Sequence, residues 1–387
     1  MIPVLAVFID GLKPESVEYM EFLNTLNLKR IKTELINYSN TCHASIYTGV
    51  YPNKHKIQFI WKYSPNTSPF KFLRKFKIHK IPCSKTILKL IYHSITHLKG
   101  GKNVYGAPYL LNIPVDKWSL FDFDVVKHWG KPNTFLGEYP TIFGILERNN
   151  VDYSVIWALK NSISIIKKSF SQLGALNYIF IGELDPLSHK FGQNSPEVRN
   201  FLQSLDKVLE YKYKEFKKIN DDFTFILFSD HGHIEIKNKD IINLRKIFKL
   251  YNENPSDYLF FLDAVHARFW FRNEKEKKKV QRILSYLDDK GFILRHEILT
   301  KYNAEMPDNR YGDLIFCLEP PYVFDVVDPR TVSMHGYLPS YSDLDGVCIS
   351  NRKITKHYIK LQDIAPTILH ALRLKIPNYM DGEPIWK

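Results

Sequence analysis

Short hydrophobic runs alternate along the chain with longer segments of helical periodicity. Four β-branched, apolar runs are typical of strands that are buried on both faces: Val4 to Ile9, Asp152 to Trp157, Tyr178 to Ile181 and Phe223 to Phe228. Because strands that alternate with helices favour a mostly parallel sheet covered on both faces, we expect an α/β fold.

Three segments carry clear helix signals. The first helix is expected to begin at Ser195, with Pro196 in its first turn, and the second to run from about Glu274 to Asp289, with Gly291 just beyond its end. The third follows Asp363. The first has an apolar stripe typical of a helix packed on a core, formed by Val198, Phe201, Leu202, Leu205, Val208 and Leu209.

The composition indicates a large folded protein with an anionic partner. The 387 residues are 44% hydrophobic, which excludes a disordered chain. We expect one large domain over 1–387 with insertions, or two domains. The expected insertions are a basic and aromatic cap at 53–135 and a smaller insertion or subdomain at 240–330. The net charge of +13 suggests a phosphate ester, nucleic acid or lipid headgroup as partner, without choosing among them.

The basic cap has a composition of its own. Between Lys62 and Val115 there is no Asp or Glu, while basic residues accumulate at Lys71, Arg74, Lys75, Lys77, Lys80, Lys85, Lys89, Lys99 and Lys102. One helical face there is apolar, with Ile87, Leu88, Ile91, Ile95 and Leu98. This face predicts a helix packed on the core, and contact with an anionic membrane surface is the alternative.

The cysteines and hydropathy favour a cytoplasmic protein. Cys42, Cys83, Cys317 and Cys348 lie far apart, without a CxxC pair or a dense disulfide framework. The first ten residues lack the pattern of a signal peptide, and no apolar stretch reaches the length that spans a bilayer. We therefore expect a reduced, cytoplasmic protein, at most peripheral at the membrane.

Three of the predicted strands are followed by an acidic residue at a similar place. Asp10 follows the first, Asp185 comes shortly after Ile181, and Asp230 with His231 follows Phe228. In a parallel sheet these ends fall on one edge, where α/β folds build their sites. A single acid there is more often a helix cap, but three acids with nearby histidines indicate ligands.

The ligand types point to a transition metal. His189 follows Asp185 by four residues, which places both side chains on one face of a helix. Gly232 after His231 permits a sharp turn. Carboxylate with neutral imidazole suits zinc, and manganese or another transition metal also fits such a site, whereas calcium and magnesium prefer more oxygen ligands.

The order of the motifs resembles the alkaline phosphatase superfamily, specifically the type I phosphodiesterase/nucleotide pyrophosphatase family. The matching segments are Phe8-Ile9-Asp10-Gly11, the stretch from Ser39 to Pro52 with His55 after it, Glu183 to His189, Ser229-Asp230-His231-Gly232, Met334-His335-Gly336-Tyr337 and Met380-Asp381-Gly382. The resemblance spans nearly the whole chain and implies an alkaline-phosphatase-like fold.

The resemblance also implies roles for individual residues. Asp185, His189 and His335 would hold one divalent metal ion, and Asp10, Asp230 and His231 would hold the other. Two cations about 3.5–4 Å apart can clamp the attacking and leaving oxygens of an in-line displacement at phosphorus.

Ser39 occupies the family's nucleophile position. Thr41 is the rival nucleophile, and the alternative for Ser39 is a helix N-cap without catalytic function. By the same analogy, His43 and His55 are expected to be local structural groups.

Some positions depart from the family pattern. The asparagine that binds a phosphoryl oxygen is missing from a stretch that reads Gln58-Phe59-Ile60-Trp61. Its role is left to the metals and the backbone, or to another side chain such as Asn40. Trp61 and Tyr63, in an aromatic cluster, are expected to contact the second ester group. Cys42 suggests a sulfatase, but the arginine of that motif is missing.

The sequence thus predicts a hydrolase that cleaves a phosphodiester or pyrophosphate bond through a covalent phosphoserine. The substrate is expected to be a small phosphate ester, whether nucleotide, sugar-nucleotide or lipid-linked, and specific nucleic-acid binding is not expected. A phosphomonoesterase or phosphoryl transferase on the same scaffold is one alternative. A non-catalytic protein that binds membranes or polyanions is an alternative of another class.

Overall fold

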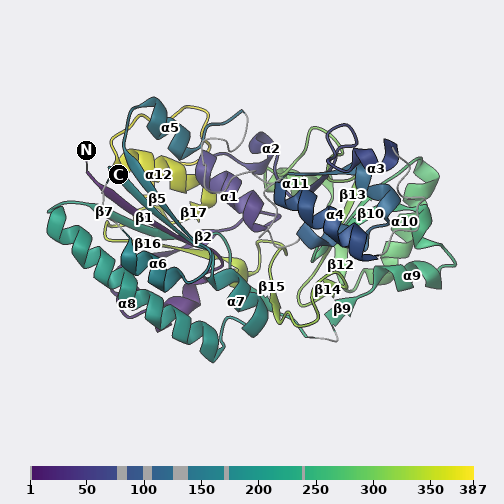
Figure 1. Ribbon diagram of the computed structural model, residues 1–387, viewed down its shortest axis with the longest axis horizontal. Coiled ribbons are helices and arrows are strands. Elements are labelled where there is room, and N and C mark those ends of the chain that lie inside the picture. Colours follow the sequence, from purple (N-terminus) through teal and green to yellow (C-terminus); the bar gives the residue numbers. More distant parts are fainter. Residues whose placement is uncertain (1, 76–84, 99–106, 125–137, 170–173, 238–239) are drawn as a thin grey trace. The chain divides into compact units, whose positions relative to one another are not determined.

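The computed structural model describes residues 2–75, 85–98, 107–124, 138–169, 174–237 and 240–387 (Figure 1). The chain forms two compact units. One, here called the sheet unit, comprises 1–55, 130–235 and 330–387, and the other, the insert unit, comprises 56–129 and 236–329. The insertions expected at 53–135 and 240–330 stay predictions.

A seven-stranded sheet forms the centre of the sheet unit. Its order is β17 (Ile359–Lys360), β2 (Asn27–Lys32), β16 (Gly346–Ser350), β7 (Thr224–Phe228), β1 (Val4–Ile9), β6 (Leu176–Ile181) and β5 (Tyr153–Ala158). β1 pairs in parallel with β6 and β7, and β5 pairs in parallel with β6. Only β16 runs antiparallel to its neighbours in this sheet. The prediction of a mostly parallel α/β sheet is therefore confirmed.

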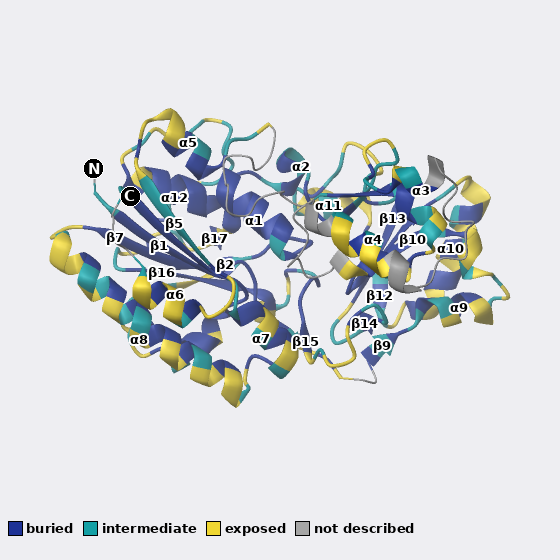
Figure 2. Ribbon diagram, viewed as in Figure 1, coloured by how far each residue is buried: buried dark blue, intermediate teal, exposed yellow. Residues whose placement is uncertain are grey.

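Helices cover both faces of this sheet (Figure 1). One face carries α6 (Ser162–Lys168), α7 (Leu184–Phe191) and α8 (Pro196–Ile219), and the other carries α1 (Ser39–Thr48), α5 (Ile142–Arg148) and α12 (Ile364–Ala371). The short α2 (Pro52–His55) follows α1. Figure 2 shows buried strands in the middle of the unit and an exposed outer face on α8.

The predicted helix after Ser195 forms as α8. The Ser195 side chain caps it by accepting a hydrogen bond from the amide of Val198 at 3.2 Å. Val198, Leu202, Leu205 and Leu209 of the predicted stripe are buried. The stripe packs on the sheet with residues of β1, β6 and β7 in one hydrophobic core.

The helix predicted from Glu274 ends earlier than expected. α10 covers Glu274–Leu284 and continues only as a 3₁₀ turn at Ser285–Leu287. Gly291 begins strand β12 (Gly291–Ile293) instead of capping the helix, so that part of the prediction is wrong. A Cβ atom at Gly291 would lie 2.5 Å from the carbonyl oxygen of Cys317, so the close approach of two strands accounts for this glycine.

The insert unit contains an antiparallel sheet in the order β10 (Leu259–Leu262), β11 (His266–Trp270), β13 (Leu314–Leu318) and β12. Two short ladders join β3 (Trp61–Tyr63) to β4 (Phe121–Phe123) and β9 (Ile241–Ile242) to β14 (Val323–Phe324). Its helices are α3 (Lys71–Lys75), α4 (Lys85–Leu98), α9 (Leu244–Leu250), α10 and α11 (His296–Lys301).

The apolar face predicted in the basic cap falls on α4. Ile91 and Ile95 are half-buried, and Leu90 beside them is 61% exposed. The side chains of Ile87, Leu88 and Leu98 lie outside the described residues. Of the cap's basic residues, Lys71 and Lys89 are exposed, and the side chains that lie outside the description are Arg74, Lys75, Lys77, Lys80, Lys85, Lys99 and Lys102.

Contact of this cap with a membrane surface stays a prediction. Within the described ranges, no helix has both the length and the apolar character needed to cross a bilayer.

Candidate metal centre

The carboxyl ends of three neighbouring strands bring three acids to one edge of the sheet. Asp10 follows β1, Asp230 follows β7, and Asp185 lies in the first turn of α7 after β6. Asp10 and Asp185 are each 7% exposed and Asp230 is fully buried. Burial of three carboxylates so close together requires compensating positive charge.

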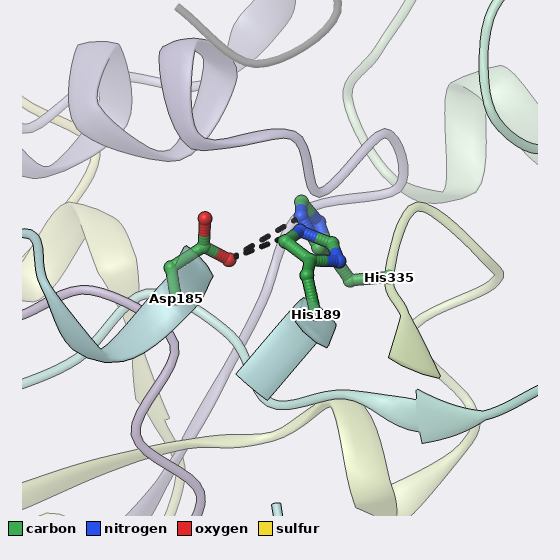
Figure 3. A group of neighbouring side chains, drawn as sticks. All are labelled: Asp185, His189 and His335. Carbon is green, nitrogen blue, oxygen red and sulfur yellow. Dashed lines mark ion pairs between the residues drawn. The ribbon is translucent and has the colours of Figure 1, made fainter. Parts of the chain in front are cut away.

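One group consists of Asp185, His189 and His335 (Figure 3). His189 lies one helical turn after Asp185 on α7, and its Nε2 is 3.3 Å from Asp185 Oδ1. His335 follows the short strand β15 (Ser333–Met334), and its Nε2 is 3.8 Å from the same oxygen. Both imidazoles therefore point at one carboxylate oxygen.

The second group consists of Asp10, Asp230 and His231. His231 Nε2 lies 3.6 Å from Asp10 Oδ1 and 3.4 Å from Asp230 Oδ2. Asp230 Oδ1 accepts hydrogen bonds from the amides of Gly11 and His231, each at 3.1 Å, which fixes the carboxylate and leaves Oδ2 facing the site. The rings of His231 and His335 stack at 3.8 Å, so the two groups are adjacent.

Two glycines allow the carboxylates and imidazoles to lie this close together. Gly11 has φ +77°, a left-handed conformation that favours glycine, and it directs its amide to Asp230. Gly232 is needed for a different reason from the sharp turn expected from sequence. A Cβ atom at Gly232 would lie 2.1 Å from the carbonyl oxygen of Asp343, which leaves no room for a side chain.

Backbone carbonyls determine which nitrogen of each histidine faces the carboxylates. The Nδ1 atoms of His189 and His335 lie 2.8 Å from the carbonyl oxygens of Ser333 and Asn37, and His231 Nδ1 lies 3.1 Å from that of Gly232. Because a carbonyl oxygen can only accept, each Nδ1 carries the proton and each Nε2 presents a lone pair to the site. Metal-binding histidines are held in this way.

The cluster fits divalent cations. Asp185 Oδ1 and Asp230 Oδ2 are buried without a hydrogen-bond partner among the described residues. In the same part of the chain, no lysine or arginine pairs with Asp10, Asp185 or Asp230. Lone pairs from carboxylates and imidazoles thus converge without compensating positive charge, which is the donor chemistry of a transition-metal site.

The electrostatics of the carboxyl groups reflect this crowding. Burial, together with the charges of Asp230 and Asp185, raises the pKa of Asp10 well above its usual range. Burial raises the pKa of Asp230 to about 8, against the opposing effect of the Gly11 amide. Burial would also raise the pKa of Asp185, but His189 and His233 outweigh it and hold this pKa well below its usual range.

Two of the imidazoles show the opposite effect, whereas the pKa of His189 is raised because Asp185 outweighs the lowering effect of burial. Burial, followed by the neighbouring His233, lowers the pKa of His231 to about 3, and burial with the charge of His231 lowers the pKa of His335 well below its usual value. Neutral imidazole is the form that binds metal.

Ser39 lies at the beginning of α1 beside the second group. Its Oγ is 3.5 Å from Asp10 Oδ1 and 3.5 Å from His231 Nε2. Tyr38 is the N-cap of the helix and Ser39 the first helical residue, so Ser39 is not the N-cap that the alternative required. Ser39 is half-buried, whereas the rival nucleophile Thr41 is fully buried.

The residues predicted to contact substrate lie in different parts of the chain. Asn40 follows Ser39 on α1 and is 6% exposed. Trp61 and Tyr63 lie on β3 in the insert unit. Trp61 is fully buried, with its ring 3.8 Å from that of Phe123, so it forms part of the core of that unit. Tyr63 is half-buried.

Two histidines that were not predicted as ligands also lie in the cluster. His43, expected as a structural group, has its Nε2 3.6 Å from Asp230 Oδ2 and 3.8 Å from Asp10 Oδ2. His233 lies near Asp185 and His231. In the sequence, the position of His233 two residues after His231 could have indicated that it lies in the cluster. His55 contacts Ser45 Oγ at 3.1 Å, away from the metal groups.

The fold and this cluster define the class of protein, an alkaline-phosphatase-like α/β protein with candidate metal sites at the carboxyl edge of its sheet. The family model for type I phosphodiesterase/nucleotide pyrophosphatase matches residues 115–338, more than half of the chain. The chain belongs to this family, whose members are metal-dependent phosphodiesterase and pyrophosphatase enzymes.

Two curated relatives are similar in sequence over part of the chain. Mouse ectonucleotide pyrophosphatase/phosphodiesterase family member 7 is 27% identical over 157 residues, which cover 40% of this chain and 33% of the mouse protein. The rat protein of the same name is 25% identical over 189 residues, covering 41% of this chain and 40% of the rat protein. These matches span well under half of either relative.

Solved structures show the fold over nearly the whole chain. Human ectonucleotide pyrophosphatase/phosphodiesterase 5 superposes with a TM-score of 0.68 at 14% identity, covering 98% of this chain and 97% of that chain. An inactive variant of the murine protein in complex with AMP superposes with a TM-score of 0.66 at 13% identity, covering 98% of both chains. The predicted alkaline-phosphatase-like fold is therefore confirmed.

Proposed function

We propose that this chain hydrolyses a phosphodiester or pyrophosphate bond, with Ser39 as the nucleophile and two divalent cations bound in the adjacent groups. The observation that carries the proposal is the position of Ser39 Oγ, 3.5 Å from both Asp10 Oδ1 and His231 Nε2. A hydroxyl that is half-exposed beside paired carboxylate and imidazole ligands is placed to attack an incoming phosphorus atom.

Each group of side chains has a role in this proposal. Asp185, His189 and His335 would hold one cation, and Asp10, Asp230 and His231 would hold the other. Bound cations would neutralise the phosphoryl oxygens and favour ionisation of the serine hydroxyl. The mixture of nitrogen and oxygen donors favours zinc, with manganese or another transition metal as the alternative.

The reaction is proposed to take place in two displacements. Ser39 Oγ forms a bond to phosphorus, the bond from phosphorus to the leaving oxygen breaks, and the hydroxyl proton departs toward Asp10 Oδ1, the carboxylate oxygen within 3.5 Å of Ser39 Oγ. Water then attacks the phosphoserine, and the Ser39 Oγ–phosphorus bond breaks. One proton of this water passes to Ser39 Oγ, which regenerates the serine, while the water oxygen and the other proton stay on the phosphate product.

The substrate class is inferred from the family. The family name refers to nucleotide pyrophosphatases, and the murine structure that superposes on this chain contains AMP. A nucleotide with a phosphodiester or pyrophosphate bond is therefore the proposed substrate. A phosphomonoester is the alternative substrate.

The test compares Ser39→Ala with Thr41→Val, which removes the rival hydroxyl. Hydrolysis of a nitrophenyl nucleotide diester and of nitrophenyl phosphate is measured in parallel with zinc content. We expect Ser39→Ala to lower diester turnover by at least about a thousandfold with zinc content unchanged, and Thr41→Val to retain activity. Turnover by Ser39→Ala close to that of the unaltered chain would refute the nucleophile. Metal-loaded protein that hydrolyses neither ester would favour a non-catalytic binding protein.

A further inference from the structure

His233 lies closest of three imidazoles to a single carboxylate oxygen. It immediately precedes the short strand β8 (Ile234–Glu235), and its Nε2 is 3.1 Å from Asp185 Oδ1. The Nε2 atoms of His189 and His335 are 3.3 Å and 3.8 Å from the same oxygen. The His233 side chain is fully buried.

The contacts of Ser333 determine where the His233 ring carries its proton. Ser333 Oγ donates its one hydrogen to the carbonyl oxygen of Ser188 at 2.6 Å, because that oxygen can only accept. His233 Nδ1 lies 3.3 Å from the same hydroxyl oxygen. In this contact the hydroxyl must accept, so Nδ1 is the protonated nitrogen of His233.

A lone pair on His233 Nε2 therefore faces Asp185. Both Nε2 and Asp185 Oδ1 are buried without a hydrogen-bond partner among the described residues, although they are only 3.1 Å apart. Two electron-rich atoms at this distance repel each other unless a positive charge lies beside them. A shared cation satisfies both atoms.

The pairing of two short strands keeps the ring in this position. β8 pairs with β15 so that Ser333 lies opposite Glu235 and Met334 opposite Ile234. This ladder follows directly after His233 on one strand and contains Ser333 on the other. It thus ties the histidine to the serine that orients it.

We propose that His233 is an additional protein ligand of the cation held by Asp185. The inference rests on the metal-binding part of the proposed function. With His189 and His335, it gives that cation three imidazoles and one carboxylate. The ligand atoms of Asp185, His231 and His233 lie within 4.8 Å of one another, as do those of Asp185, His189 and His335, so Asp185 belongs to both sets. These nitrogen-rich surroundings favour zinc or cobalt over magnesium or manganese.

This assignment makes the two groups unequal. A cation at Asp185 that also binds His233 would have four protein ligands and could take up a phosphoryl oxygen only as a fifth ligand. The position formed by Asp10, Asp230 and His231 lies beside Ser39 and keeps coordination positions for substrate. The serine side of the centre is therefore the side where the phosphoryl group is expected to bind.

Cobalt substitution gives a readout independent of catalysis. An imidazole that binds Co²⁺ through Nε2 retains its Nδ1 proton, which appears as a strongly shifted, exchangeable proton resonance. We expect one such signal each from His189, His231, His233 and His335. His233→Ala should lose one of them, and zinc affinity measured by chelator competition should fall by at least about 10- to 100-fold. His370→Ala, at an exposed position on α12, should change neither quantity.

The possible results test the metal centre and the role of His233 separately. Protein that binds neither Co²⁺ nor Zn²⁺ would overturn the metal centre and this inference with it. If the metal binds but His233→Ala retains every shifted signal and its zinc affinity, only the role of His233 is overturned. His233→Gln serves if the alanine variant does not fold, because it also lacks the ring. Ser333→Ala should retain all the shifted proton signals but change the chemical shift of the signal from His233.

Discussion

At the scale of single residues, backbone geometry determines the chemistry of the site. Carbonyl oxygens fix the protonated nitrogen of His189, His231 and His335, and two amides orient Asp230. The motifs supplied the residue types but not these partners, because a carbonyl group is present at every position of the chain. The same limit explains why His43 and His233 were not predicted to lie in the cluster, since their contacts with Asp10, Asp185 and Asp230 depend on residues distant in sequence.

Gly232 gives a direct test of how tightly the site is packed. Gly232→Ala places a Cβ atom 2.1 Å from the carbonyl oxygen of Asp343. We expect the free energy of unfolding to fall by at least about 2 kcal/mol, measured by urea denaturation. Gly144→Ala is the matched control, because its Cβ would meet nothing closer than 3.6 Å and it lies in helix α5. That variant should gain about 0.5–1 kcal/mol. Equal stability of the two variants would contradict the packing argument.

Glu34 predicts a pH-dependent contribution to stability. Burial raises its pKa from 4.5 to about 7, opposed by hydrogen bonds from Ser45 and Gln362. A raised carboxyl pKa stabilises the folded chain below about pH 4.5, and this contribution is lost as the pH rises through 7. Glu34→Gln should therefore gain up to about 3 kcal/mol relative to the unaltered chain between pH 4.5 and 8, in urea titrations. The exposed Glu297→Gln serves as the control. A stability difference for Glu34→Gln that does not change with pH would contradict the role of burial.

At the scale of elements, the hydrophobic runs predicted four strands of the central sheet. The runs that became β1, β5, β6 and β7 were found within two residues of their ends. The pattern did not predict β2, half of whose residues are exposed, and it also missed β16, although all five residues of β16 are buried. The extent of the helix after Glu274 was also missed, because strand pairing at Gly291 overrides the local helical signal.

The cap of α8 tests whether local signals stabilise the largest helix. Ser195 Oγ accepts a hydrogen bond from the amide of Val198. Ser195→Ala leaves that amide without its cap and should lower the free energy of unfolding by about 1 kcal/mol. Ser195→Asn, which can form the same bond, should stay close to the unaltered protein. Chemical denaturation with circular dichroism would measure both, and an alanine variant as stable as the asparagine variant would show that the cap contributes nothing.

At the scale of the whole molecule, two distant segments of sequence join to form the insert unit. Residues 56–129 and 236–329 share contacts such as the hydrogen bond from Arg268 to the carbonyl oxygen of Trp61 at 2.7 Å. Arg268 is fully buried and also pairs with Asp263 at 2.6 Å. Hydrophobic periodicity describes only residues that are neighbours along the chain. It therefore could not predict that segments 56–129 and 236–329 fold together into one unit. Trp61, one of the aromatic residues expected to contact substrate, is fully buried in this unit.

Metal binding should stabilise the folded chain as a whole. The three buried carboxylates lack lysine or arginine partners among the described residues, and a cation bound only by the folded state shifts unfolding by mass action. Zinc at about a thousand times its dissociation constant should raise the free energy of unfolding by about 4 kcal/mol. Asp185→Asn should reduce that gain, and a chelator should reverse it. Denaturation curves that coincide with and without zinc would contradict the metal centre.

The central claim is that phosphorus passes through a covalent bond to Ser39. The most direct measurement is the stereochemical course at phosphorus, with a nucleotide diester made chiral by sulfur and oxygen-isotope labelling. Two successive in-line displacements each invert the phosphorus centre, so the account predicts overall retention of configuration. Overall inversion would show a single attack by water and would contradict the account.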